Sequence, residues 1–115
     1  MANTTCFRQI GPTVALAVGT TSHAPVTISV SSNDQCNYAS FLNIGSASAA
    51  VNVAPVNAGP ASFPIDGTPQ TTIVLPPNMQ FAISYATPTA PFSVTGISST
   101  ASGSTVYITP LGDQS

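Results

Sequence analysis

The chain has 115 residues and a mass of 11.6 kDa, which is the size of one domain with a single core. Charged residues make up only 3% of it, with one Lys or Arg and three Asp or Glu, where a typical globular protein has about 25%. Because nucleic-acid binding depends on many basic contacts to phosphate, this composition excludes a nucleic-acid partner.

Hydrophobic residues alternate with small or hydroxyl residues along most of the chain. In the first runs, Val14, Leu16 and Val18 alternate with alanines, and Val26, Ile28 and Val30 alternate with hydroxyl residues. This period of two turns one side of a strand inward and the other outward. The later runs with the same character are 38–44, 49–54, 63–65, 71–75, 81–85, 92–94 and 106–108. We therefore expect about eight to ten short strands.

Turn-forming residues separate these runs about every eight to twelve positions. They are Gly11-Pro12, Gly19, Pro25, Asn33-Asp34, Gly45, Gly59-Pro60, Asp66-Gly67, Pro76-Pro77, Pro88, Gly96 and Gly103. Such spacing is typical of an all-β sandwich or jelly roll of antiparallel strands. No segment shows the 3.6-residue period of a helix, so we expect essentially no helix, and a turn at 45–50. Residues 1–12 are predicted to be an N-terminal arm or first strand, and residues 13–115 a single β-sandwich or jelly-roll domain.

Ionisable side chains are too few to build the common catalytic sites. A Ser-His-Asp arrangement would need His23, which lies in a predicted loop, and no Gly-x-Ser-x-Gly turn accompanies it. The chain has no glutamate, and its three aspartates lie beside glycine or asparagine. One histidine and two distant cysteines do not provide the spacings of a zinc site. We therefore expect no enzymatic activity, no cofactor and no metal.

No segment approaches the roughly 18 consecutive apolar residues of a membrane-spanning helix. The run Val14–Val18 is too short for the apolar region of a secretion signal. We therefore expect neither a membrane partner nor export, and Cys6 and Cys36 are expected to stay reduced.

The scarcity of charge predicts self-association. Soluble monomers are kept apart by charge, and natural sheets protect their edges with lysine, but this chain has no lysine and a net charge of −2. Small outward side chains also lose little entropy when a second surface covers them. We expect a homo-oligomer, with a trimer favoured, that is docked on a larger partner.

Three segments resemble small all-β virion proteins of tailed bacteriophages, of the head decoration or cement type. The segment 41–54 matches a "hydrophobic-x-Asn-x-Gly-Ser-Ala-x-Ala-x-Val" strand-turn-strand. A proline-bounded strand, Ile73-Val74-Leu75-Pro76-Pro77, and a closing strand at 103–112 follow it. The chain departs from the pattern at Pro76-Pro77, where Pro-Gly is expected, and in its short tail after Gly112.

The resemblance implies a protein without catalytic residues that binds the major capsid protein on the capsid surface and is assembled in the host cytoplasm. Phe7 and Arg8 are candidate interface residues, as an aromatic group to bury and a guanidinium to pair, although Phe7 could instead join the core. Tyr107 is a third candidate, because it points away from the face of Val106 and Ile108. The alternatives are a tail, neck or fibre-adaptor protein of the virion, and a glycan-binding module.

Overall fold

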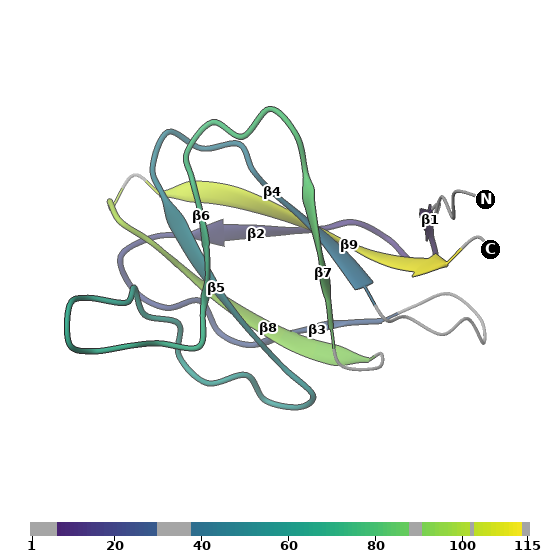
Figure 1. Ribbon diagram of the computed structural model, residues 1–115, viewed down its shortest axis with the longest axis horizontal. Helices are drawn as coiled ribbons and strands as arrows, with labels where there is room; N and C mark the ends of the chain where they lie inside the picture. The colour runs from purple at the N-terminus through teal and green to yellow at the C-terminus, as the bar shows by residue number, and fades with distance from the viewer. Residues whose placement is uncertain (1–6, 30–37, 88–90, 102, 114–115) are drawn as a thin grey trace, which may run out of the picture.

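The computed structural model describes residues 7–29, 38–87, 91–101 and 103–113, and this part of the chain forms nine strands and no helix. The strands are β1 (Phe7–Gln9), β2 (Val14–Val18), β3 (Val26–Ile28), β4 (Tyr38–Asn43), β5 (Ala49–Ala54), β6 (Ile73–Leu75), β7 (Ile83–Ala86), β8 (Phe92–Ser98) and β9 (Ser104–Asp113). They form two antiparallel sheets, as Figure 1 shows. The predicted all-β class is confirmed. The turn expected at 45–50 forms between β4 and β5, but it is shorter than expected, because Ala49 and Ala50 already belong to β5.

Sheet A has five strands, in the order β1-β9-β4-β7, with β2 beside β1 on the same side of β9. The long β9 strand pairs with β2 along its first half and with β1 along its last residues. It pairs with β2 up to Ile108 and with β1 from Leu111 onward. Pro110 lies at this changeover, and its carbonyl accepts a hydrogen bond from the N–H of Ile10 at 3.2 Å.

Sheet B has four strands, in the order β3-β8-β5-β6. The pairings between strands are nested along the chain: β2 pairs with β9, β3 with β8, β4 with β7, and β5 with β6. The two pairings β4–β9 and β5–β8 complete the sheets. Neighbours in space are thus often distant in sequence.

The core lies between the two sheets and is built from the inward residue of each alternating pair. Its largest fully buried side chains are Phe41, Phe92, Leu16, Ile28, Leu75 and Ile108. The β4 strand shows the pattern plainly, since Ala39, Phe41 and Asn43 are buried while the residues between them are half-buried. Burial of this apolar area is the main stabilising contribution to a domain of this size.

A buried polar cluster around Asn43 joins the three segments that carry the family resemblance. The Asn43 side chain donates to the carbonyls of Ala47 at 2.9 Å and Pro76 at 3.0 Å, and it accepts from the N–H of Gly45 at 3.0 Å. The hydroxyl of Ser104, at the start of the closing strand, also donates to Ala47 at 2.6 Å. The asparagine and glycine of the motif therefore have a structural role.

Two sequence-based expectations about strands are wrong. The predicted strand at 63–65 does not form, and only an isolated bridge joins Ile65 to Thr68. Gly96, expected to break a strand, lies within β8. A side chain there would meet Val18 at 2.8 Å and Leu16 at 2.9 Å, so glycine lets β2 pack directly on β8.

Gly103 lies at a tight turn into β9, and we expect Gly103→Ala to lower the free energy of unfolding by about 2 kcal/mol or more. Its φ is +74°, and an added Cβ would collide with the carbonyl oxygen of Val18. Gly67 is the matched control, because its φ is +83° but an added Cβ would meet nothing within 4 Å. Urea unfolding should show a smaller loss for Gly67→Ala, and equal losses would contradict the predicted collision.

Candidate functional site

The two sheets differ in what covers their outer faces. On sheet B, residues 55–62 form a strap that is held by polar side chains of β8. The N–H of Ala58 donates to the hydroxyl of Ser93 at 3.0 Å, and the hydroxyl of Thr95 donates to the carbonyl of Gly59 at 2.6 Å. Ser93 is 4% and Thr95 is 1% exposed, although both point away from the core. The middle of sheet B is therefore covered by the chain itself.

The outer face of sheet A has no such strap within the described residues. Its side chains are half-buried or exposed, and none of them is charged. The face consists of Ala15, Ala17, Tyr38, Ser40, Leu42, Ser84, Ala86, Thr105, Tyr107, Thr109 and Leu111. Except for two tyrosines and two leucines, these are small side chains. Such a surface can be covered by another protein with little loss of side-chain entropy or of charge solvation.

Tyr107 lies in the middle strand of this face. It is directly opposite Leu42 on β4 and Ala15 on β2, and it is half-buried, while Val106 and Ile108 on either side are fully buried. The prediction that Tyr107 points away from the core is thus confirmed. A tyrosine on an uncharged face is the kind of side chain that often dominates the binding energy of an interface.

The other two candidate interface residues lie in β1, which pairs with the last residues of β9 at one end of sheet A (Figure 1). Phe7 pairs with Asp113, and Arg8 pairs with Gly112. Residues 7–9 therefore form a first strand, which is one of the two predicted alternatives for the segment 1–12. The side chains of Phe7 and Arg8 are outside the described part of the structure, as are residues 1–6, so their role as anchors stays a prediction.

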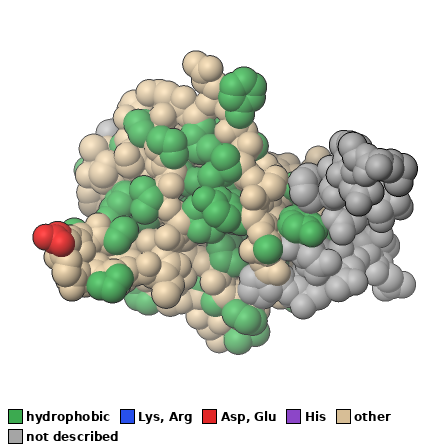
Figure 2. Space-filling view, in the orientation of Figure 1, with side chains coloured by type: hydrophobic (Ala, Val, Ile, Leu, Met, Phe, Trp, Pro, Cys, Tyr) green, Lys and Arg blue, Asp and Glu red, His purple; other side chains and the backbone are tan. Residues whose placement is uncertain are grey.

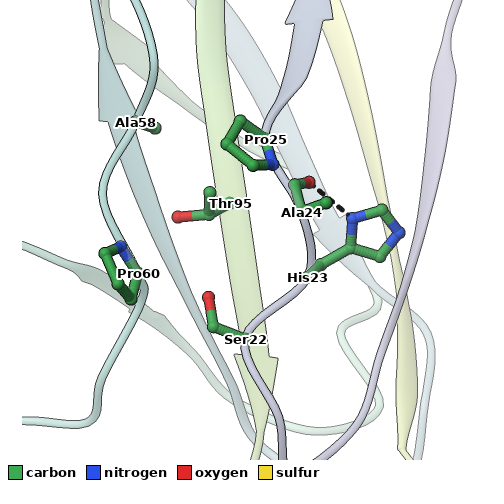
Figure 3. Close-up of a pocket in the computed structure, with 7 residues that line it drawn as sticks. All are labelled: Ser22, His23, Ala24, Pro25, Ala58, Pro60 and Thr95. Carbon is green, nitrogen blue, oxygen red and sulfur yellow. Dashed lines mark hydrogen bonds between the residues drawn. The ribbon is translucent and has the colours of Figure 1, made fainter.

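His23 lies beside an open hollow of about 250 Å³, between the β2–β3 connection and the strap. In Figure 3 its imidazole ring is on the opposite side of its own segment from Ser22, Thr95 and Pro60. Its Nδ1 is 2.7 Å from the carbonyl oxygen of the neighbouring Ala24. The groups that face the hollow are therefore uncharged.

The described acidic residues lie on other segments than this histidine. Asp66 lies in the Ile65–Thr68 hairpin, and Asp113 ends β9. Among the described residues no three His, Cys, Asp or Glu side chains form a group that could hold a metal ion. The same part of the chain has no helix long and apolar enough to cross a membrane. Cys6, Cys36 and Asp34 are outside the described residues.

Sequence reasoning missed two surface features. One is the strap, whose only sequence signal is the loss of alternation between 55 and 62. The other is the edge of β7 that has no partner strand among the described residues, where Tyr85 is 40% exposed and Phe81, just before the strand, is 81% exposed. The alternation predicted both aromatic residues in one strand, which is right for Tyr85 and wrong for Phe81, and it did not show that this strand would lie at an edge.

Comparison of the chain with protein-family models, with curated proteins and with solved structures found no match.

Proposed function

We propose that this chain is a non-catalytic structural protein of a bacteriophage particle, a capsid decoration or cement protein. In this role it forms a homo-oligomer and binds the lattice of the major capsid protein, which stabilises the head. It acts on the capsid surface after assembly in the host cytoplasm.

The outer face of sheet A is the observation that carries the proposal. Within the described residues it is uncovered and its side chains carry no charge, whereas the opposite sheet is covered by the strap. Interfaces favour aromatic residues at their centre and contain few charges there, which fits Tyr107 and its neighbours. A protein that works as a building block needs such a face and needs no reactive group.

The nested strand pairing also supports the proposal. First-with-last pairing, repeated inward to β5 and β6, is the order expected of a jelly roll. Jelly rolls occur in viral capsid proteins, but also in lectins and enzymes, so the fold by itself does not establish the function. We include the jelly-roll assignment in the proposal.

The surroundings of the tyrosines favour protein docking over the glycan-binding alternative. Sugar recognition would require an amide or carboxylate beside the exposed ring. The residues directly opposite Tyr107 are leucine and alanine, and those directly opposite Tyr38 are Leu111 and Ala86. A tail, neck or fibre-adaptor protein would use the same kind of face, and only the position in the particle distinguishes it.

We expect the purified chain to sediment with capsids of the phage that encodes it, in a saturable manner, and Tyr107→Glu to weaken this binding by about tenfold or more. The substitution buries a charge in the middle of the interface, and circular dichroism should show that the variant is still folded.

Val56→Glu is the matched control, because Val56 is 74% exposed and lies on the strap. It should bind as the unmodified chain does. Binding of the chain to tails but not to capsids would support the tail alternative. Binding to neither, or a map of the particle without this chain, would contradict a structural role in the virion.

A further inference from the structure

The sandwich has two open sides, where a chain segment crosses from one sheet to the other: one between β2 and β3, and one between β6 and β7. The two sides differ in the hydrogen bonds that the crossing segment makes. On the β2–β3 side, the connecting segment is bonded to β8: the N–H of His23 donates to Gly96 and the N–H of Ser98 donates to Gly19, both at 2.7 Å. On the β6–β7 side, the N–H of Asn78 donates to Gly45 in the turn after β4, and the N–H of Met79 donates to Asn43 at the end of β4. The described backbone bonds join β6 to β5 and β7 to β4, but not β6 to β7.

The β7 strand therefore has one edge without a partner strand among the described residues. Sheet edges in natural proteins are protected by very short strands, by proline or by lysine. The β3 and β6 strands have three residues each and adjoin Pro25 and Pro76. The four residues of β7 are Ile83-Ser84-Tyr85-Ala86, which include neither proline nor charge, and the last three are exposed.

Hydrophobic side chains gather on this side of the molecule. Figure 2 shows them in the middle of the face that β6 and β7 cross in Figure 1. Ile73 and Ile83 on the two strands are only partly buried, and Tyr85 and Phe81 are exposed. The acidic side chain visible in Figure 2 lies at the left-hand tip, away from this patch. Covering the patch would thus remove apolar area from water without burying a charge.

The size of this face fits a protein partner. The molecule measures 42 × 29 × 27 Å, and the face lies across the two longer dimensions. The outline of the molecule on this side, which includes residues outside the described part, is at most about 1,200 Å², while a stable interface buries about 800 Å² on each partner. A second copy of the chain would bring the same uncharged edge. Because antiparallel strands can be related by a two-fold axis, β7 can pair with the β7 of that copy without any other complementary sequence.

We propose that the free edge of β7, together with Phe81 and Tyr85, binds a second copy of this chain across a two-fold axis. The two A sheets then form one continuous sheet, and the aromatic side chains of each copy cover the open side of the other. This deepens the self-association contained in the proposed function, and it gives pairs of chains rather than the trimer favoured from the sequence.

The test uses the purified full chain without any capsid, so its outcome is independent of the proposed role in the particle. Size-exclusion chromatography with light scattering, over a series of concentrations, should give the mass of two chains. Ser84→Lys should raise the dissociation constant by about tenfold, because the two-fold axis brings the introduced lysines close together. Phe81→Ala should also weaken the pair, through loss of apolar contact.

Two control variants test whether weaker pairing of Ser84→Lys arises from the charge at the β7 edge or from any change of charge or of residue 84. Thr20→Lys adds the same charge at an exposed bend after β2, and Ser84→Thr keeps an uncharged edge, so both should pair as the unmodified chain does. Circular dichroism should show that Ser84→Lys is folded. A monomer at all concentrations, or a pair that Ser84→Lys leaves intact, would overturn the proposal. A trimer would overturn it too, while supporting the oligomer of the proposed function.

Discussion

Asn43→Ala is expected to lower the free energy of unfolding by about 3–4 kcal/mol, because it removes the centre of the buried polar cluster. Asn43 is fully buried, and its side chain is bonded to three backbone groups. The carbonyl of Ala47 keeps the hydroxyl of Ser104 as a partner, but the carbonyl of Pro76 and the N–H of Gly45 lose theirs. An unpaired group costs about 1–3 kcal/mol when it is buried, and these two are partly buried, so most of the expected loss comes from the removal of the three hydrogen bonds of Asn43.

Asn52→Ala is the matched control for this measurement. Asn52 donates a single hydrogen bond to the strap at Gly59, at 3.0 Å, in an exposed position. The expected loss is about 0.5–1 kcal/mol by urea unfolding. If both substitutions cost the same, the cluster around Asn43 does not have the stabilising role assigned to it.

Asn43→Asp tests the direction of the hydrogen bonds. The ionised carboxylate cannot donate to the two carbonyls, so folding raises the pKa of the introduced group above its usual value. A group with a raised pKa in the folded state is tolerated below its unfolded pKa of about 4 and destabilises as the pH rises above it. The loss of stability relative to the unmodified chain should therefore be larger at pH 7 than at pH 4.

Phe41→Ala is expected to lower the free energy of unfolding by about 3–5 kcal/mol, the range for removal of a buried aromatic side chain. Phe41 is fully buried in β4, where it faces Ile108 of β9 on one side and Ile83 of β7 on the other. Its ring also meets Tyr85 edge-on, with centroids 6.0 Å apart. The substitution thus leaves a cavity where three strands meet.

The same change at Phe81 serves as the control, because this ring is 81% exposed. At a concentration at which the chain is a monomer, Phe81→Ala should change the stability by less than about 0.5 kcal/mol in a urea titration. A loss below about 1 kcal/mol for Phe41→Ala would contradict the packing described for the core.

Much of the candidate site was predictable from the sequence, because the direction of a strand side chain is a local property. Tyr107 follows Val106 and precedes Ile108, and successive residues of a strand point to opposite faces. Whether the face of Tyr107 is open was not predictable. The strap covers sheet B through contacts of Ser93 and Thr95 with residues about 35 positions away, and local alternation carries no information on such contacts.

The errors at Gly96 and Phe63 have the same origin. Glycine within a strand is costly for isolated backbone, but at Gly96 the close approach of β2 requires it. The alternation at Phe63 and Ile65 has the period of a strand, but in the structure it makes only an isolated bridge to Thr68. A strand requires a partner as well as a pattern.

The sequence by itself determined the all-β class, most of the strands, the side of each strand that turns inward, and the near absence of charge. These follow from the identity of adjacent residues and from the two-residue period of extended backbone. Only the tertiary structure decided which strands are neighbours, which sheet face is covered and which edge is left free. Those features depend on hydrogen bonds and packing between residues far apart in the chain, which form only when the two sheets come together.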